Sequence, residues 1–267
     1  MKNHFFAFSM CLVFLTFSTA ITMADIMEGL VGYWPLDEGS GKVAHDASGN
    51  GHDGTLDHGP TWVAAADAKM GTGALLFDGT DDRVSIDGFD VEGGTGITIA
   101  CWFNASNLDT PGNDPRMVSK ATSGENADHW FMLSSSREGG IKILRFRLRT
   151  DGITDEKKAH PDGTIELNVW IHATIAWDGA TMLIYKNGVE VGSLPKTGNL
   201  DVDPSVGMAI GNQPDGAENR PFDGVIDDVA IWNRALTPAE IADVMTNGIP
   251  VAVEPGGKLA ITWGAIK

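Results

Sequence analysis

Short apolar runs separated by turn-forming residues repeat along this chain from residue 29 to residue 232, and this pattern limits the fold more than any other feature. Apolar and polar side chains alternate within many of the runs, as in "GITIACWF" and "ILRFRLR". Alternation places successive side chains on opposite faces of a strand. In "YKNGVEV", Asn187 and Gly188 supply the two positive-φ residues of a tight hairpin turn. Runs this short and this numerous predict an all-β fold in which two antiparallel sheets pack together.

One helix is expected, after the last apolar run, in "LTPAEIADVMTNG". Thr237 is suited to the N-cap, Pro238 to the first helical position, and Glu240 completes a capping box. Gly248 is suited to ending the helix. The sequence therefore predicts one short C-terminal helix, packed on the edge of the sandwich.

The first residues, "MKNHFFAFSMCLVFLTFSTAITMA", have a basic start at Lys2, an apolar run from Phe5 to Phe17 and small residues before Ala24. This is the composition of a secretory signal peptide. We expect residues 1–24 to be that signal, residues 25–249 to form one domain, and residues 250–267 to form a tail that folding does not need. An edge strand is the alternative for the tail. No later apolar run reaches the roughly 18 residues of a membrane span, so the expected location is secreted, cell-surface or periplasmic.

Charge and cysteine content exclude several classes of partner. The net charge is −17, and nucleic acid and anionic membranes attract basic surfaces, so neither is an expected partner. Two cysteines are present, and one of them, Cys11, lies in the expected signal. Cys101 then has no partner for a disulfide, and a cysteine-rich zinc site is excluded.

The stretch "HDASGNGHDGTL", residues 45–56, is the first candidate site. Its oxygen-bearing side chains are spaced like the start of an EF-hand loop, but neither flanking segment can form a helix. Two interpretations remain: a glycine-rich connection held by Asx turns, or a calcium site.

Six segments, taken in order, resemble the laminin-G-like jelly rolls of the concanavalin A-like lectin and glucanase superfamily, of the secreted bacterial type. They span residues 29–248: "GLVGYWPLDEGSG", "DASGNGHDGTL", "ALLFDGTDDRVSI", "ITIACWFN", "WIHATIAWDGATMLIYKNG" and "FDGVIDDVAIWNRALTPAEI". The resemblance implies a two-sheet antiparallel jelly-roll sandwich, often with a structural calcium on its rim. It also implies that Asp227, at the start of the last long strand, contributes to that calcium. The expected calcium set is Asp46, Asn50, the carbonyl of His52, and Asp227.

Catalytic members of the superfamily carry a Glu-x-Asp-x-x-Glu strand, and this chain has no such run. The adjacent pair Asp227 and Asp228 should point to opposite faces of its strand. The seven histidines are not closely paired, and no Gly-x-Ser-x-Gly elbow occurs. We therefore expect no catalytic residue and no enzymatic activity.

Three residues are candidates for ligand binding. In "KILRFRLR", Arg145 and Arg147 should lie on the face opposite Leu144 and Phe146. Such a basic row suits either cross-strand ion pairs or an anionic ligand. Trp130, which follows the polar loop "TSGENAD", is the candidate for a partly exposed aromatic platform.

These features predict an exported, non-catalytic module that binds carbohydrate or another cell-surface polymer and holds a structural calcium. A structural or protein-adhesion module without glycan binding is the alternative, and a hydrolase or lyase of the same fold is the less favoured one. The expected partners are a glycan or an extracellular protein.

Overall fold

A computed structural model of the chain describes residues 26–123, 125, 128–214 and 219–250. The expected signal, residues 1–24, lies outside the described residues, as does the tail beyond Pro250. No helix within the described ranges is long and apolar enough to cross a membrane.

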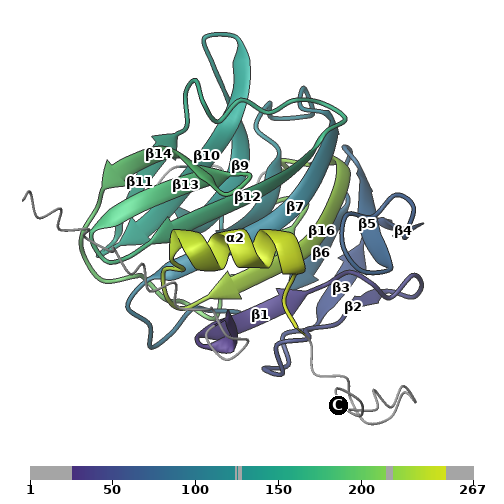
Figure 1. The fold of residues 1–267 in the computed structure, drawn as a ribbon, viewed down its shortest axis with the longest axis horizontal. Coiled ribbons are helices and arrows are strands. Elements are labelled where there is room, and N and C mark those ends of the chain that lie inside the picture. The colour runs from purple at the N-terminus through teal and green to yellow at the C-terminus, as the bar shows by residue number, and fades with distance from the viewer. Residues whose placement is uncertain (1–25, 124, 126–127, 215–218, 251–267) are drawn as a thin grey trace, which may run out of the picture.

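Two eight-stranded antiparallel sheets form the fold, as expected (Figure 1). Sheet A has the order β14 (Val189–Pro195), β13 (Thr181–Lys186), β12 (Trp170–Trp177), β7 (Ile97–Asn107), β16 (Asp223–Trp232), β5 (Gly73–Asp78) and β4 (Thr61–Ala64). Its eighth strand, β1 (Leu30–Trp34), pairs with the second half of β16, beyond the end of β5.

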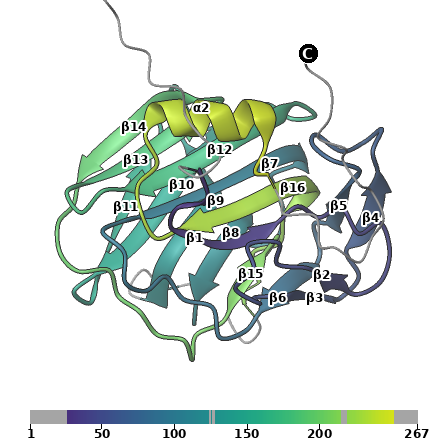
Figure 2. The same ribbon diagram turned by 60° about the horizontal axis from the view of Figure 1, so that its bottom comes forward.

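Sheet B has the order β11 (Ile153–Lys158), β10 (Ile141–Thr150), β9 (His129–Glu138), β8 (Arg116–Ala121), β15 (Met208–Ile210), β6 (Arg83–Ile86), β3 (Gly54–Asp57) and β2 (Val43–Ala44). Figure 2 shows the short strands β2, β3 and β6 grouped at one side of the molecule. The alternating runs "GITIACWF" and "ILRFRLR" form β7 and β10, and "YKNGVEV" joins β13 to β14, as predicted. Strands β2, β3, β4 and β11 were not predicted, because their sequences are short or polar and show little alternation.

The core lies between the sheets and is built by the alternation seen in the sequence. From sheet A, β7 contributes Ile99, Cys101 and Phe103, and from sheet B, β10 contributes Leu144 and Phe146. All are fully buried. Cys101 is a free thiol whose pKa is raised by this burial, so it is inert packing rather than a reactive group.

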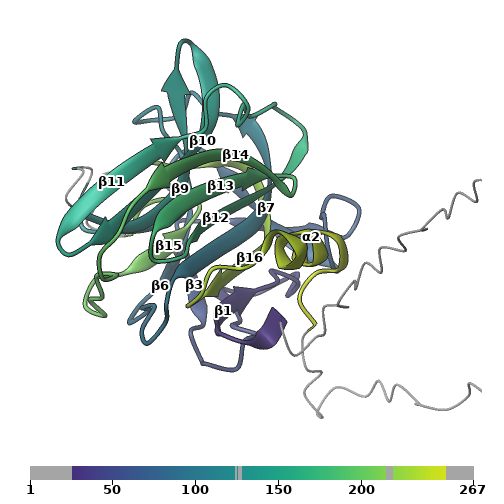
Figure 3. The same cartoon turned by 60° about the vertical axis from the view of Figure 1, so that its left-hand side comes forward.

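Helix α2 (Pro238–Asn247) begins with the predicted capping box, in which Thr237 and Glu240 hydrogen-bond to each other's backbone N–H, and its C-cap is Gly248. The expectation that it covers an edge of the sandwich is wrong. Ile241 and Val244 pack on the outer face of sheet A, in one cluster with Tyr185 and Trp232. Figure 3 shows α2 beside β16 and β1, on the side of the molecule away from β10 and β11. Small and aromatic residues on that face leave an apolar surface that the helix buries.

Candidate functional site

The loop at residues 45–53 is braced by its own side chains. Asp46 Oδ1 accepts hydrogen bonds from the N–H of Tyr33 (3.0 Å) and of Ser48 (2.9 Å), and Asp46 Oδ2 accepts from the N–H of His52 (2.9 Å). Although burial alone would raise it, these hydrogen bonds hold the pKa of Asp46 below its ordinary value. Asn50 Nδ2 donates to the carbonyls of Leu30 and Val31. The Asx-turn interpretation therefore describes this loop, with Asp46 tying it to β1.

Asp227 lies on the outer face of sheet A, opposite Trp102 of β7. Its Oδ2 accepts from the N–H of Lys69 (2.8 Å) and of Met70 (2.9 Å), whereas its buried Oδ1 has no hydrogen-bond partner among the described residues. Burial, with a smaller contribution from the charge of Asp228, raises the pKa of Asp227 to about 7.

The expectation that Asp227 and Asp228 point to opposite faces is wrong. The register between β16 and β7 shifts after Asp227, and Asp228 has φ 50°, so a bulge interrupts the alternation. Asp228 Oδ1 accepts from the hydroxyl of Tyr33 (2.5 Å), which packs on the outer face beneath α2. Both carboxylates thus lie on the outer side of sheet A.

The four expected calcium ligands fall into two groups. Asp46, Asn50 and His52 surround β1, while Asp227 contacts the segment at residues 69–70. No hydrogen bond within the described part of the chain joins Asp227 to the other three. The carbonyl of His52 accepts from Trp34 Nε1 (2.9 Å), so this oxygen also has a structural partner.

Three other aspartates form a cluster that was not among the expected calcium ligands. Carboxylate oxygens of Asp78, Asp81 and Asp82 lie within 4.8 Å of one another, in the turn between β5 and β6. Asp78 Oδ1 accepts from the N–H of Thr80 (2.8 Å), and Asp82 Oδ2 accepts from the N–H of Asp78 (2.9 Å). These bonds shape the turn.

The arginine row lies on the outer face of sheet B, as alternation predicted, and is engaged in ion pairs. Arg145 contacts Asp114 (2.5 Å) and Glu156 (3.2 Å), and Arg147 contacts Glu156 (2.8 Å). Arg145 and Arg147 are only 4% and 8% exposed. The ion-pair interpretation is therefore confirmed, and little of either guanidinium is left for a ligand.

Trp130 is 9% exposed, so the expectation of a partly exposed platform is wrong. The guanidinium carbon of Arg149, two residues beyond Arg147, lies 4.7 Å from its ring centroid and covers it. His129 completes this buried surface, with its ring nitrogens 3.5 Å from Arg116 and from Arg147. Burial and these guanidinium charges lower the pKa of His129 to about 4.

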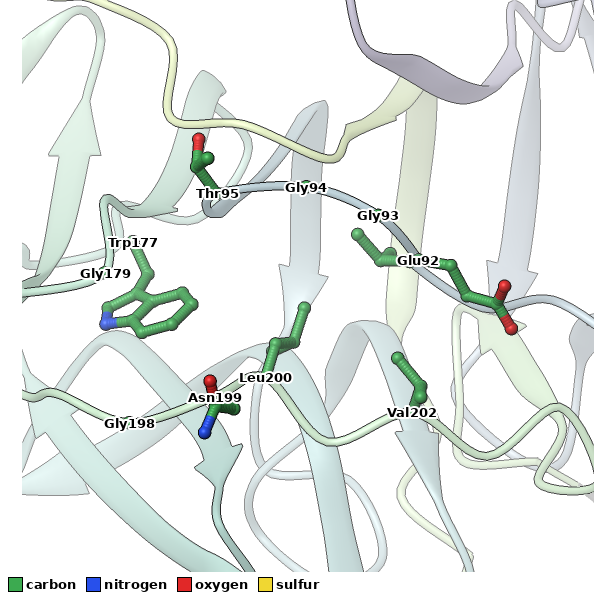
Figure 4. A pocket seen from close by; sticks show the side chains of 11 residues that line it. Glu92, Gly93, Gly94, Thr95, Trp177, Gly179, Gly198, Asn199, Leu200 and Val202 are labelled. Atoms are coloured by element: carbon green, nitrogen blue, oxygen red, sulfur yellow. The ribbon is translucent and has the colours of Figure 1, made fainter.

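Two cavities open on the rim of the sandwich. The first, which we name the glycine cleft, has a volume of about 580 Å³ (Figure 4). Its lining residues are Val91, Glu92, Gly93, Gly94, Thr95, Trp177, Gly179, Gly198, Asn199, Leu200 and Val202. The second, the polar cavity, has a volume of about 470 Å³ and is lined by Gly29, Leu30, Val31, Asn50, His52, Gly88, Asp90, Glu92, Pro204 and Asn233. Glu92 lines both, so the cavities adjoin at this residue.

Close contacts hold one wall of the glycine cleft, residues 92–94, against Asn233. Asn233 Nδ2 donates to the carbonyl of Glu92 (3.1 Å), and a Cβ at Gly94 would overlap the carbonyl of Asn233. A larger residue at position 94 would push this segment outward. Sequence reasoning missed the cleft, and the signal available was the glycine-rich connection "GFDVEGGTG" between β6 and β7.

Lys120 holds together the two connections that border the cavities. Its ammonium group donates to the carbonyls of Phe89 (2.8 Å), Asp203 (2.8 Å) and Val206 (2.7 Å), and lies 3.5 Å from Asp90. The side chain is fully buried. One cation thus joins strand β8 to both connections that border the cavities.

A family model described as the concanavalin A-like lectin/glucanases superfamily, Laminin_G_3, matches residues 78–242. The chain belongs to this family. The laminin-G-like domain is also 28% identical over 222 residues to the human adhesion G-protein coupled receptor D1, covering 81% of this chain but only 23% of the receptor.

Solved structures share the fold of the laminin-G-like domain. Domain 4 of AbnA, a GH43 extracellular arabinanase from Geobacillus stearothermophilus, in complex with arabinotriose, has a TM-score of 0.61 at 19% identity, covering 81% of this chain and 98% of that one. The ligand binding domain of botulinum neurotoxin serotype D in complex with N-acetylneuraminic acid has a TM-score of 0.58 at 15% identity, covering 84% and 52%. At these identities the likeness shows the fold alone.

Proposed function

We propose that this laminin-G-like domain is an exported, non-catalytic glycan-binding module whose ligand lies in the glycine cleft. The observation that carries the proposal is the composition of that cleft. The lining combines the polar residues Glu92, Thr95 and Asn199 with the apolar residues Leu200 and Val202, which are labelled in Figure 4. A sugar ring presents hydroxyls at its edge and C–H groups on its faces, so it needs both kinds of surface.

The binding of arabinotriose, an uncharged oligosaccharide, by a structurally similar domain supports the ligand class. The number of acidic residues in the cleft supports the proposal that the module is non-catalytic. Glycoside hydrolysis needs a pair of carboxyl groups about 5–9.5 Å apart across the bond, and Glu92 is the single acid among the described residues lining the cleft. The basic row is an unsuitable site, because Arg145 and Arg147 are buried in ion pairs.

Val202→Trp tests whether the glycan binds in the glycine cleft. Val202 is 48% exposed and lines the cleft, so an indole at this position should fill it without disturbing the core. We expect glycan binding on an array to fall at least about tenfold, with the melting temperature nearly unchanged. Val189→Trp is the matched control, because Val189 is 65% exposed on edge strand β14 and lines neither rim cavity. Equal binding by both variants would place the ligand elsewhere.

A protein-adhesion role is the second candidate, and the relationship to an adhesion receptor supports it. In that case the domain would bind none of the glycans on an array.

We further propose that calcium stabilises the domain through Asp227. The support is the buried Oδ1 of Asp227, which lacks a hydrogen bond among the described residues and would gain a partner in a bound cation. Asp46 fits less well, because its oxygens already accept three backbone N–H groups.

Excess calcium added to metal-stripped protein is expected to raise the melting temperature, because a ligand of the folded state stabilises it by mass action. At a calcium concentration 100 times the dissociation constant, the gain is about 2.7 kcal/mol. Asp227→Ala should abolish the shift, and Asp81→Ala should keep it. Identical melting curves in calcium and in chelator would show that calcium does not stabilise the domain.

A further inference from the structure

We infer that the ligand of the glycine cleft is an uncharged or amine-bearing oligosaccharide that crosses Glu92 into the polar cavity, and that acidic glycans are rejected. The inference rests on the proposed function and names the ligand class of the same site. It is carried by Glu92, the lining residue at which the two cavities adjoin, and by the charges that line them.

The adjoining positions of the two cavities set the length of the ligand. The glycine cleft and the polar cavity each have the volume of a small-molecule site, and they adjoin at Glu92. The connection at residues 202–204 runs along both, contributing Val202 to one cavity and Pro204 to the other. A single sugar would occupy one of the cavities, whereas a chain of several sugars would extend through both.

Charge sets the class of the ligand. Glu92 and Asp90 are acidic, and no lysine or arginine occurs among the described lining residues of either cavity. Asp90 lies 3.5 Å from the ammonium group of Lys120, which offsets its charge. Glu92 is exposed and forms no ion pair within the described ranges. An unpaired carboxylate at the junction would repel a carboxylated or sulfated sugar and attract an amine.

The position of the arginines also argues against an acidic ligand. An acidic glycan is bound through basic side chains, and the row on β10 is buried against Asp114 and Glu156 on the outer face of sheet B. The net charge of −17 adds a long-range repulsion of acidic polymers.

The experiment is a titration of the full chain with three trisaccharides of equal length: chitotriose, its de-acetylated triamine and a trigalacturonate. Each is also compared with its monosaccharide. We expect the trigalacturonate to bind at least about tenfold more weakly than the better of the other two, and each bound monosaccharide to bind at least about tenfold more weakly than its trimer. Glu92→Gln should reduce the discrimination against the acid at least about threefold. Glu138→Gln, an exposed acid that lines neither rim cavity, should leave it unchanged.

Two failures are distinguishable. If binding is lost in Val202→Trp but the acidic trimer binds as well as the neutral one, or if Glu92→Gln leaves the ratio unchanged, the inference is overturned and the proposed function stands. If none of the sugars binds, or if Val202→Trp binds normally, the proposed site fails and the inference fails with it.

Discussion

Arg145→Gln is expected to lower the free energy of unfolding by about 1.5–3 kcal/mol, the contribution of hydrogen bonds to charged groups. The guanidinium of Arg145 contacts Asp114 at 2.5 Å and Glu156 at 3.2 Å, and it also donates to Ser134 Oγ at 3.0 Å. Glutamine retains part of the volume but carries no charge, so each carboxylate loses one of its cations. Asp114 keeps its ion pair with Arg116, and Glu156 keeps its ion pair with Arg147. Urea denaturation followed by tryptophan fluorescence measures the change.

Arg137→Gln is the matched control. Arg137 pairs with Asp109, but the two side chains are 47% and 62% exposed, so solvent screens the pair. Exposed pairs contribute about 0–1 kcal/mol, and the control should fall within that range. A loss below about 1 kcal/mol in Arg145→Gln would show that the carboxylates of sheet B do not depend on this arginine.

Lys120→Met is expected to destabilise the domain by about 3–5 kcal/mol and to weaken glycan binding in the protein that remains folded. Methionine fits the volume but removes the donor that three carbonyls share and the cation next to Asp90. The carbonyl of Asp203 keeps the N–H of Val206 (3.0 Å), whereas those of Phe89 and Val206 lose their side-chain donor. Each unsatisfied buried group costs about 1–3 kcal/mol, and local rearrangement relieves part of the sum. Binding should fall because the connections at residues 88–92 and 202–206 lose their common anchor.

Lys42→Met is the matched control for Lys120→Met, because it removes a lysine charge without removing an anchor of the two connections. Lys42 is exposed, so its replacement should change the free energy of unfolding by less than about 0.5 kcal/mol. Chemical denaturation measures stability, and titration well below the melting temperature measures binding. A Lys120→Met protein that is less stable but binds glycan with unchanged affinity would show that Lys120 holds the core without positioning the site.

Local patterns in the sequence were enough to predict much of the fold. The hairpin at Asn187 and Gly188 has φ values of 51° and 78°, and the capping box of α2 is present, because both depend on neighbouring residues alone. Strand β11 was not predicted, because its sequence "ITDEKK" has almost no apolar residues. It becomes a strand by pairing with β10, where Glu156 lies opposite Arg147. That partner is the preceding strand, joined to β11 by a two-residue turn at Asp151 and Gly152 (φ 48° and 77°), and this turn was the signal available in the sequence.

The candidate site was predicted less well. Alternation placed Arg145 and Arg147 on the outer face, but their burial comes from Asp114 and from β11, which alternation does not report. The glycine cleft is made by connections far apart in the chain, and its polar groups are few. The family resemblance pointed to Asp227 as a calcium ligand, but the bulge that follows it depends on the register with β7 and was not predicted. Whether it binds calcium stays a prediction.

The arrangement of β1 against β16 has a mechanical consequence. Leu30, at the start of β1, pairs with Trp232, at the end of β16, and Ile26 and Ile249 belong to the same cluster beneath α2. Tension that separates residue 26 from residue 249 would first lift α2 from the sheet. It would then peel β1 from β16 one pair at a time, beginning at Leu30, instead of loading all pairs together. Because Leu30 and Val31 line the polar cavity, stretching the domain would open that cavity early and loosen its hold on a bound chain.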